Sequence, residues 1–188
     1  MEYNTEFWNK YTDENESNYN EEFAKFIRDL AVSLRSTSVL EVGCNTGNDL
    51  REFPENFEVY GIDLNELALD FARQKLPSFK FKNGSIMDLP YGDFSMDFVF
   101  THNLLNYIPE QEMDKAIKEL YRVSKKYILN CELFDENEST INDMNIVFWK
   151  RNVHKRWLNY KVKIISNVDM HEDIEPKKPR FTLVKKIS

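Results

Sequence analysis

A short run of residues near position 43 has the composition of a ligand-binding turn. The run Glu41–Gly47 reads EVGCNTG and directly follows a buried-type apolar segment. Glycine lets the backbone turn with positive φ and approach a ligand closely, and N–H groups at such a turn can face a ligand where the next helix starts. About twenty residues further on, Asp63 follows a second apolar segment. A carboxylate at this position can accept both ribose hydroxyls of an adenosine-type cofactor.

The glycines of the chain are few and confined to one region. Only five occur in 188 residues, all between positions 43 and 92. We interpret Gly43, Gly47, Gly61 and Gly84 as placed for one adenosine-bearing ligand, with Gly84 close to an adenine edge. A third glycine after Gly47 and the lysine of a phosphate-binding loop are both missing. The wider turn suits a ligand without pyrophosphate, and a NAD-dependent oxidoreductase is the less favoured alternative.

Composition excludes several other classes of protein. The net charge is −7 and the pI is about 5.1, unlike a basic nucleic-acid or membrane-surface binder. The chain has no apolar run long enough to span a membrane, and its polar, acidic start is not a signal peptide. Two cysteines and three widely spaced histidines form no recognisable metal site or disulfide framework. We expect one metal-free cytoplasmic domain over residues 1–188, with no nucleic-acid or membrane partner.

Alternating apolar segments indicate the elements that position these residues. The chain predicts a helix over 19–35, a strand over 38–42, a helix over 46–53, a strand over 57–62, a helix over 65–75, a strand over 79–81, a strand over 96–101, a helix after Pro109 and a strand over 126–131. After position 135 the pattern predicts a helix over 146–158 and two antiparallel strands over 161–168 and 180–185. This order is typical of a doubly wound α/β fold with a mostly parallel sheet. Ligands of such sheets bind beyond the carboxyl ends of the strands, where the turn and Asp63 would meet.

Three segments carry a family resemblance. Residues 39–47 (VLEVGCNTG) resemble the first motif of class I S-adenosylmethionine (SAM)-dependent methyltransferases. Residues 84–90 (GSIMDLP) are similar to the third segment of that family, with Ser85 where aspartate is usual, and residues 97–108 resemble its fourth strand and the loop beneath the substrate. The likeness covers residues 38–132. It implies a seven-stranded, mostly parallel Rossmann-like methyltransferase sheet with an antiparallel C-terminal strand, and SAM as the cofactor.

The resemblance also implies roles for individual residues. The glycine turn would hold the methionine end of SAM, Asp63 its ribose and Ile86 its adenine. Residues 1–18 would form a lid in which Trp8 and Tyr11 enclose the site, or else their rings dock on the sheet edge. The cofactor-binding set that we expect is Trp8, Tyr11, Glu41, Gly43, Asn45, Gly47, Asp63, Leu64, Ser85, Ile86 and Thr101.

A narrower likeness concerns the methyl acceptor. Phe7-Trp8, Asn45, residues 126–132 and residues 148–151 are together similar to methylases associated with pseudaminic acid biosynthesis. Tyr107 and Asn103 depart from that pattern. The likeness implies a small-molecule acceptor, an acidic or amino sugar or a nucleotide-sugar. A basic cluster, Lys150, Arg151, Lys155 and Arg156, would either attract an anionic acceptor or form a solvated helix face.

Three residues are candidates for catalysis. Methyl transfer from a sulfonium is an in-line displacement that depends mainly on positioning, and it needs a base only if the nucleophile arrives protonated. His102 could be that base or could bind the cofactor through its carbonyl alone. Tyr107 could orient the acceptor or pack the next helix, and Glu132 could accept a proton or cap a loop. Because no base is certain, a non-catalytic SAM-binding or partner protein is the alternative function.

Overall fold

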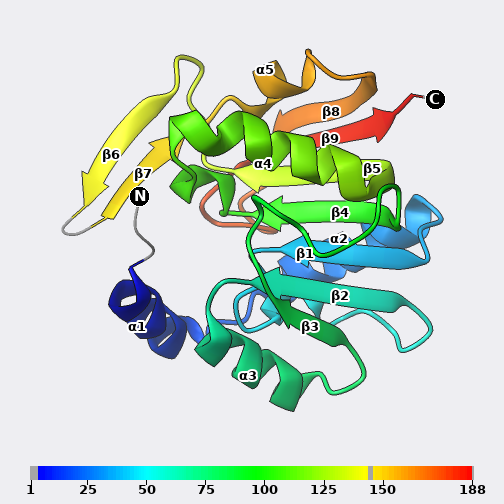
Figure 1. Cartoon of the computed structure of the whole chain (residues 1–188), viewed down its shortest axis with the longest axis vertical. Helices are drawn as coiled ribbons and strands as arrows, with labels where there is room; N and C mark the ends of the chain where they lie inside the picture. Colours follow the sequence, from blue (N-terminus) through cyan, green and yellow to red (C-terminus); the bar gives the residue numbers. More distant parts are fainter. Residues whose placement is uncertain (1–3, 144–145, 188) are drawn as a thin grey trace.

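A seven-stranded sheet forms the centre of the molecule (Figure 1). The computed structural model describes residues 4–143 and 146–187. In spatial order the strands are β3 (Lys80–Asn83), β2 (Glu58–Asp63), β1 (Ser38–Val42), β4 (Met96–His102), β5 (Ser124–Glu132), β9 (Arg180–Lys186) and β8 (Val162–Asp169). Strands β1 to β5 are parallel, and β9 runs antiparallel to both β5 and β8. The predicted α/β sheet with an antiparallel C-terminal strand is confirmed.

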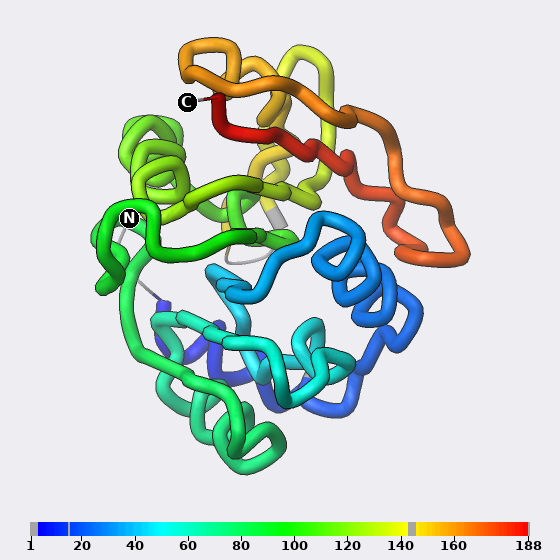
Figure 2. The backbone as a smooth tube through the Cα atoms, turned by 90° about the vertical axis from the view of Figure 1, so that its right-hand side faces the viewer, coloured from blue at the N-terminus to red at the C-terminus, as the bar shows by residue number. Residues whose placement is uncertain are grey.

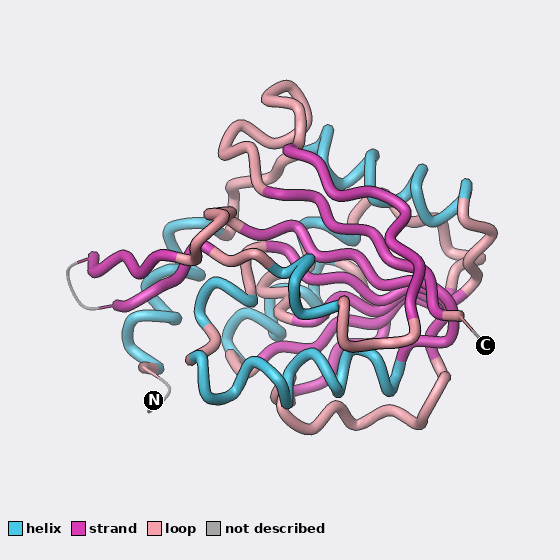
Figure 3. The backbone as a smooth tube through the Cα atoms, turned by 90° about the horizontal axis from the view of Figure 1, so that it is seen from above, coloured by secondary structure: helices cyan, strands magenta, loops and turns pink. Residues whose placement is uncertain are grey.

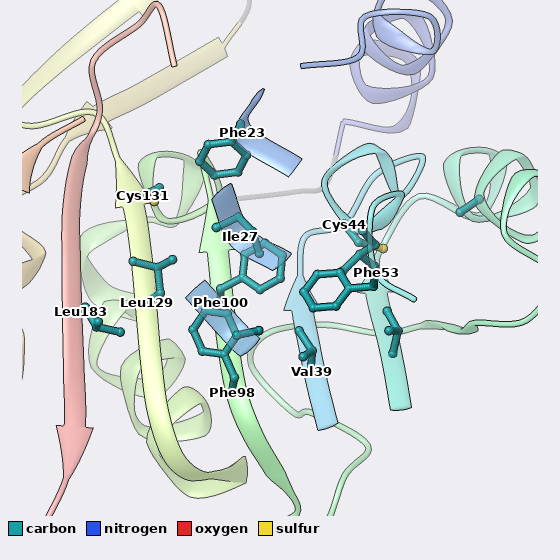
Figure 4. Packing of buried hydrophobic residues seen from close by; sticks show 14 of the residues in the cluster. Phe23, Ile27, Val39, Cys44, Phe53, Phe98, Phe100, Leu129, Cys131 and Leu183 are labelled. Atoms are coloured by element: carbon teal, nitrogen blue, oxygen red, sulfur yellow. The ribbon is translucent and has the colours of Figure 1, made fainter. Parts of the chain in front are cut away.

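Helices cover both faces of this sheet, as the view along its edge shows (Figure 2). One face carries α2 (Glu21–Ser33) and α3 (Glu66–Lys75), and the other carries α4 (Glu110–Val123) and α5 (Val153–Trp157). The apolar spacing of α2 places Phe23 and Ile27 against Phe98, Phe100 and the neighbouring strands (Figure 4). Strand β4 is buried along almost its whole length, which explains its continuous apolar sequence.

Two elements that the sequence did not predict lie at the end of the sheet where the parallel strands finish (Figures 1 and 3). One is the helix α1 (Thr5–Asn15), and the other is a hairpin of β6 (Ser139–Asp143) and β7 (Ile146–Lys150). Both stand away from the main sheet. They flank the place where the ligand was expected.

Two predicted helices are wrong. Residues 46–53 contain only a single 3-10 turn, η1 (Asn48–Leu50), because Asn45 and Gly47 both have positive φ and delay the start of regular helix. Residues 146–158 contain the strand β7 followed by the short helix α5. The β-branched and aromatic residues of β7 suit a strand, and pairing with β6 decides its conformation. The helix predicted over 65–75 is confirmed, and Asn65 caps its N-terminus, since the Asn65 side chain accepts the N–H of Leu67.

The helices in the described ranges are short or polar compared with membrane-spanning helices. None has the length and apolar character that crossing a bilayer requires.

Candidate active site

A cleft of about 1060 Å³ opens at the carboxyl ends of the parallel strands. It is lined by α1, the loops after β1, β2, β3 and β4, the start of β7 and the loop between β8 and β9. Most of the predicted site residues line it: Trp8, Tyr11, Glu41, Gly43, Asn45, Asp63, Leu64, Ser85, Ile86, His102 and Tyr107. Gly47, Thr101 and Glu132 are not among the lining residues. The structure therefore brings together residues from segments that are more than 100 positions apart.

The turn after β1 has an unusual backbone. Gly43, Asn45 and Gly47 all lie in the left-handed region, with φ of 79°, 44° and 73°. Asparagine tolerates this region better than other side chains with a Cβ, which explains why Asn45 can stand between the two glycines. A Cβ on Gly43 would also lie 2.8 Å from a methyl carbon of Leu104. Gly43 is thus required by the turn itself.

Asp63 closes the turn from the end of β2. One carboxylate oxygen accepts the N–H of Asn45 and the other accepts the N–H of Asn65, each at 2.8 Å. Burial raises the pKa of Asp63, although these N–H groups lower it. The N–H of Leu64 also lowers this pKa. Asp63 is therefore fixed in place by the backbone of both loops, and its carboxylate lines the cleft as a hydrogen-bond acceptor.

Two other glycines have a different explanation from the predicted one. A Cβ on Gly61 would meet Phe81 at 2.6 Å and Cys44 at 2.7 Å, and one on Gly84 would meet Ile62 at 2.7 Å. Side chains of the protein fill the space at these positions. The interpretation that a single ligand explains four glycines is wrong for Gly61, and at Gly84 packing against Ile62 is sufficient.

Two carboxyl groups lie side by side beneath the turn. Glu41 is buried at the end of β1, and burial together with the charge and hydrogen bond of Asp49 raises the pKa of Glu41 well above its usual range. One buried oxygen of Glu41 has no hydrogen-bond partner among the described residues. This oxygen can accept a hydrogen bond from a ligand in the cleft.

His102 lies between two carboxylates. Its Nδ1 is 2.7 Å from Asp49, its Nε2 is 3.9 Å from Glu175, and its ring stacks on Phe23. Burial favours the neutral imidazole, but Asp49, Glu175 and Glu132 outweigh it and raise the pKa of His102. A histidine held in its cationic form by such neighbours is poorly suited to accept a proton. His102 instead links three segments through its contacts with Asp49 in η1, Phe23 in α2 and Glu175 in the β8–β9 loop.

Glu132 lies behind the cleft at the end of a buried polar relay. The indole N–H of Trp157 donates to Asn130, Asn130 donates to Thr101, and Thr101 donates to Glu132, over distances of 2.7 to 2.9 Å. Burial raises the pKa of Glu132 to about 7, while Thr101 and the N–H groups of Leu105 and Asn106 lower it. These amides belong to η2 (Leu105–Tyr107), so the relay holds the segment that carries Tyr107.

Helix α1 is tied to the cofactor loops through one residue. Thr12 is buried, donates to the side chain of Asn45 and accepts from that of Asn65. Trp8 meets Tyr107 edge to face at 4.9 Å, and Trp8 meets Tyr11 in the same way at 5.5 Å. The N-terminal segment thus covers the cleft, which is the place predicted for a lid.

The two arginines of the basic cluster are held within the fold by ion pairs. Arg151 is 1% exposed and pairs with Glu110 and Glu138 at 2.6 and 3.5 Å. Arg156 pairs with the same two carboxylates, and Lys155 pairs with Glu136. Neither predicted role fits Arg151 and Arg156, since their charges are neutralised within the fold.

Four residues of the cleft were missed in the sequence: Thr12, Asp49, Asn103 and Glu175. Asn103 has a positive φ of 51° directly after β4. It is one of the two residues that depart from the pattern of the pseudaminic acid methylases. Glu175 comes from a loop far along the chain and is held by the side chain of Asn20 and the N–H of Lys177. Local sequence patterns contain no signal for such long-range partners.

The hydrogen-bond acceptors that line the cleft fit SAM. The carboxylate of Asp63 is one acceptor, and Glu41 retains a buried oxygen without a hydrogen bond to any described residue. The ammonium and hydroxyl groups of SAM are donors, and its sulfonium is a cation that suits the surrounding carboxylates. No group of metal-ligating side chains was found among the described residues.

Comparison with known proteins agrees with this geometry. Residues 39–127, a little under half of the chain, match the family model of a methyltransferase domain. This segment is therefore similar to methyltransferase domains. The match favours that class over the NAD-dependent oxidoreductase.

Relatives of the methyltransferase domain act on different acceptors. Demethylmenaquinone methyltransferase of Lactobacillus johnsonii is 33% identical over 112 residues, which are 54% of this chain and 44% of that protein. A tRNA N(3)-methylcytidine methyltransferase of Schizosaccharomyces pombe is 24% identical over 63% of this chain and 45% of that protein. The chain spans about two fifths of the length of the curated relatives that it matches.

Solved methyltransferase structures share the fold. An amino pentose methyltransferase from Micromonospora echinaspora, solved with SAM bound, has a TM-score of 0.68 at 13% identity, over 87% of this chain and 90% of that one. The common architecture extends beyond residues 39–127 into the C-terminal strands.

Proposed function

We propose that the chain is a SAM-dependent methyltransferase that acts on a small-molecule acceptor. The observation that carries the proposal is Asp63, a partly buried carboxylate that accepts the N–H groups of Asn45 and Asn65 and lines the cleft at the end of β2. This arrangement matches the two adjacent hydroxyls of a ribose.

Different residues of the cleft would bind different parts of SAM. Gly43 and Asn45 would shape the turn around the methionine end, Glu41 with Asp49 would accept the ammonium group, and Ser85 with Ile86 would border the adenine. Bound SAM supplies an electrophilic methyl group. The carboxylates around the cleft stabilise the positive charge there, and the lid formed by α1 excludes water.

We assign positioning roles to two of the predicted catalytic residues. His102 is neutralised by Asp49 and Glu175 and holds three segments together. Glu132 holds the amides of η2 from behind the cleft. Tyr107 lines the cleft directly, and burial raises its pKa to about 12, so it is a neutral phenol that can orient an acceptor.

A sugar is the acceptor class that the narrower likeness implies. The structural neighbour that acts on an amino pentose supports an acceptor of this size and chemistry. The alternatives to a sugar acceptor are a quinone or a tRNA, which are the acceptors of two relatives. A cytoplasmic location also remains a prediction.

Calorimetric titration with S-adenosylhomocysteine tests the cofactor site. We expect Asp63→Ala to weaken binding by about tenfold or more, because charge-assisted hydrogen bonds to both hydroxyls are lost. Asp70→Ala, on the exposed face of α3, is the matched control. An analogue without the ribose hydroxyls should lose the same factor with the wild type and nothing further with Asp63→Ala. Failure of the wild-type protein to bind S-adenosylhomocysteine would overturn the proposal.

A non-catalytic SAM-binding protein is the second candidate function. The carboxylates of Asp49 and Glu175 raise the pKa of His102 and make it a poorer candidate for a base, which favours this second function. Turnover of SAM with any acceptor in a panel of sugars and amines would exclude this candidate. Cofactor binding without turnover across the panel would support it.

A further inference from the structure

Aromatic rings form a corner on one side of the cleft. Trp8 meets Tyr11 at an interplanar angle of 71° and Tyr107 at 83°, and all three residues line the cleft. Rings that meet edge to face present surfaces in different directions instead of stacking. Such surfaces attract cations, most strongly when water is excluded.

Carboxylates share the space of this corner. Asp49 and Glu175 line the same cleft as the three rings. Burial raises the pKa of Tyr11, and the charges of these two carboxylates raise it further. Glu175 is buried, and its hydrogen bonds to Asn20 and to the N–H of Lys177 fix its position. The corner thus combines aromatic faces with an anchored negative charge.

Buried acceptor atoms in the cleft lack donors. Among the described residues, the side-chain oxygens of Asn48 and Asn103 have no hydrogen-bond partner. Asn103 follows His102 and precedes Leu104, beyond the end of β4, and its own N–H is bound to the carbonyl of Cys131. A ligand that satisfies these oxygens must bring N–H or O–H groups.

Positive charge in the described part of the cleft is either neutralised or exposed. The cations that line it are His102, held between two carboxylates, and Lys177, which is exposed. Arg151 and Arg156, which could have attracted an anion, are paired with Glu110 and Glu138. A carboxylate or phosphate on the acceptor would therefore meet repulsion here.

We propose that the methyl acceptor is an amine, bound as a cation in the corner formed by Trp8, Tyr11, Tyr107 and Glu175. This inference rests on the proposed methyltransferase function and narrows its acceptor from acidic or amino compounds to amines. The ammonium first gives one proton to the carboxylate of Glu175. The nitrogen lone pair then attacks the methyl carbon of the cofactor, and the electron pair of the breaking C–S bond returns to sulfur. The products are S-adenosylhomocysteine and the methylated ammonium ion.

Three probes of the same shape and different charge test the inference. The protein is saturated with S-adenosylhomocysteine and titrated with choline, with its uncharged carbon isostere dimethylbutanol, and with tert-butylacetate, by protein chemical-shift changes. We expect choline to bind about tenfold more tightly than the alcohol and the anion to bind most weakly. Equal binding of choline and the alcohol, tighter binding of the anion, or no choline binding at the highest soluble concentration would overturn the inference.

Variants locate the effect in the corner. Glu175→Gln and Trp8→Leu should each lower the choline-to-alcohol affinity ratio by roughly fivefold, a ratio that does not depend on the folded fraction. Glu172→Gln, exposed on the same loop, should leave the ratio unchanged. An unchanged ratio in both corner variants would place choline elsewhere and overturn the inference. Each titration starts from the S-adenosylhomocysteine complex. Failure to form that complex would therefore contradict the proposed methyltransferase function, and not the inference about the acceptor.

Discussion

Glu132 shows how burial changes the chemistry of a single residue. Its side chain is 1% exposed, and it is the end point of the relay from Trp157 through Asn130 and Thr101. Its pKa of about 7 lies above the ordinary value of 4.5. The folded protein therefore binds this proton more tightly than the unfolded chain does.

This residue should make stability depend on pH. The stabilising effect of the bound proton is complete below pH 4.5 and is lost as the pH rises through 7. Between these limits the wild type should lose up to about 3 kcal/mol relative to Glu132→Gln, which cannot titrate. Urea denaturation across this pH range measures the difference. Glu55→Gln, an exposed substitution, should follow the wild type, and parallel curves for wild type and Glu132→Gln would contradict the expectation.

Gly43 is constrained by the backbone of its turn as well as by its predicted contact with the cofactor. A bulky residue at this position would fill the space predicted for the methionine end of SAM. The positive φ and the close approach of Leu104 mean that Gly43→Val strains the turn itself. Asp63 is therefore the cleaner position at which to test cofactor binding.

Helix α1 illustrates an element whose position depends on very few contacts. Thr12 is its only buried residue among those whose side chains are described, and it bonds to Asn45 and Asn65, which flank Asp63 in space. Closure of the lid and the shape of the cofactor loops are thus coupled through one hydroxyl.

Loss of this hydroxyl should loosen the lid. Thr12→Val keeps the size and branching of the side chain but removes two hydrogen bonds, each of which contributes about 1 kcal/mol. We expect S-adenosylhomocysteine to dissociate several times faster, and hydrogen exchange of the α1 amides to accelerate. Thr140→Val, exposed on β6, is the control. Unchanged dissociation would show that α1 does not retain the cofactor.

The ion pairs between α4, α5 and the segment around β6 and β7 depend on two arginines. Arg151 also contacts the carbonyl of Ile108, so it fixes the loop before α4 as well. Removing Arg151 leaves this carbonyl without its donor.

Two substitutions separate this structural role from a surface role. Arg151→Met should lower the free energy of unfolding by about 1–3 kcal/mol, because the carbonyl of Ile108 loses its donor while Glu110 and Glu138 keep Arg156 as a partner. Lys155→Met, at an exposed pair with Glu136, should cost less than about 1 kcal/mol. Urea denaturation measures both. Similar small effects for the two variants would mean that the whole cluster is a solvated helix face after all.

At the scale of the molecule, the cleft concentrates the negative charge of an acidic protein. The carboxylates of Glu41, Asp49, Asp63 and Glu175 line one cavity, in a chain whose net charge is −7. A low-dielectric cavity lined by one sign of charge focuses the field on its ligand.

This field should discriminate between cofactor analogues. Sinefungin has a carbon bearing an amino group in place of the sulfonium, and it carries one more positive charge than S-adenosylhomocysteine. We expect it to bind several times more tightly at low ionic strength, with a smaller advantage at high salt. Calorimetry at two salt concentrations measures this. Tighter binding of S-adenosylhomocysteine at both would contradict the predicted role of the cleft charge.

The sequence by itself determined the central sheet and the cofactor half of the site. Apolar periodicity predicted β1 to β5 and the helices α3 and α4, and the spacing from Gly43 to Asp63 predicted where a ribose would bind. Each of these signals is local, because a strand or a turn is specified by residues that adjoin one another. The positive φ values of the turn were likewise anticipated by its glycines.

Only the tertiary structure decided which side chains meet across the fold. The pairing of His102 with Asp49 and Glu175, the relay to Glu132 and the neutralisation of Arg151 join residues that lie tens of positions apart. Nothing in the local pattern specifies such a partner, since charge and burial are set by whatever the sheet brings alongside. For the same reason the position of Glu175, in the β8–β9 loop beside a cleft that the loops after β1 to β4 form, is set by the tertiary structure alone.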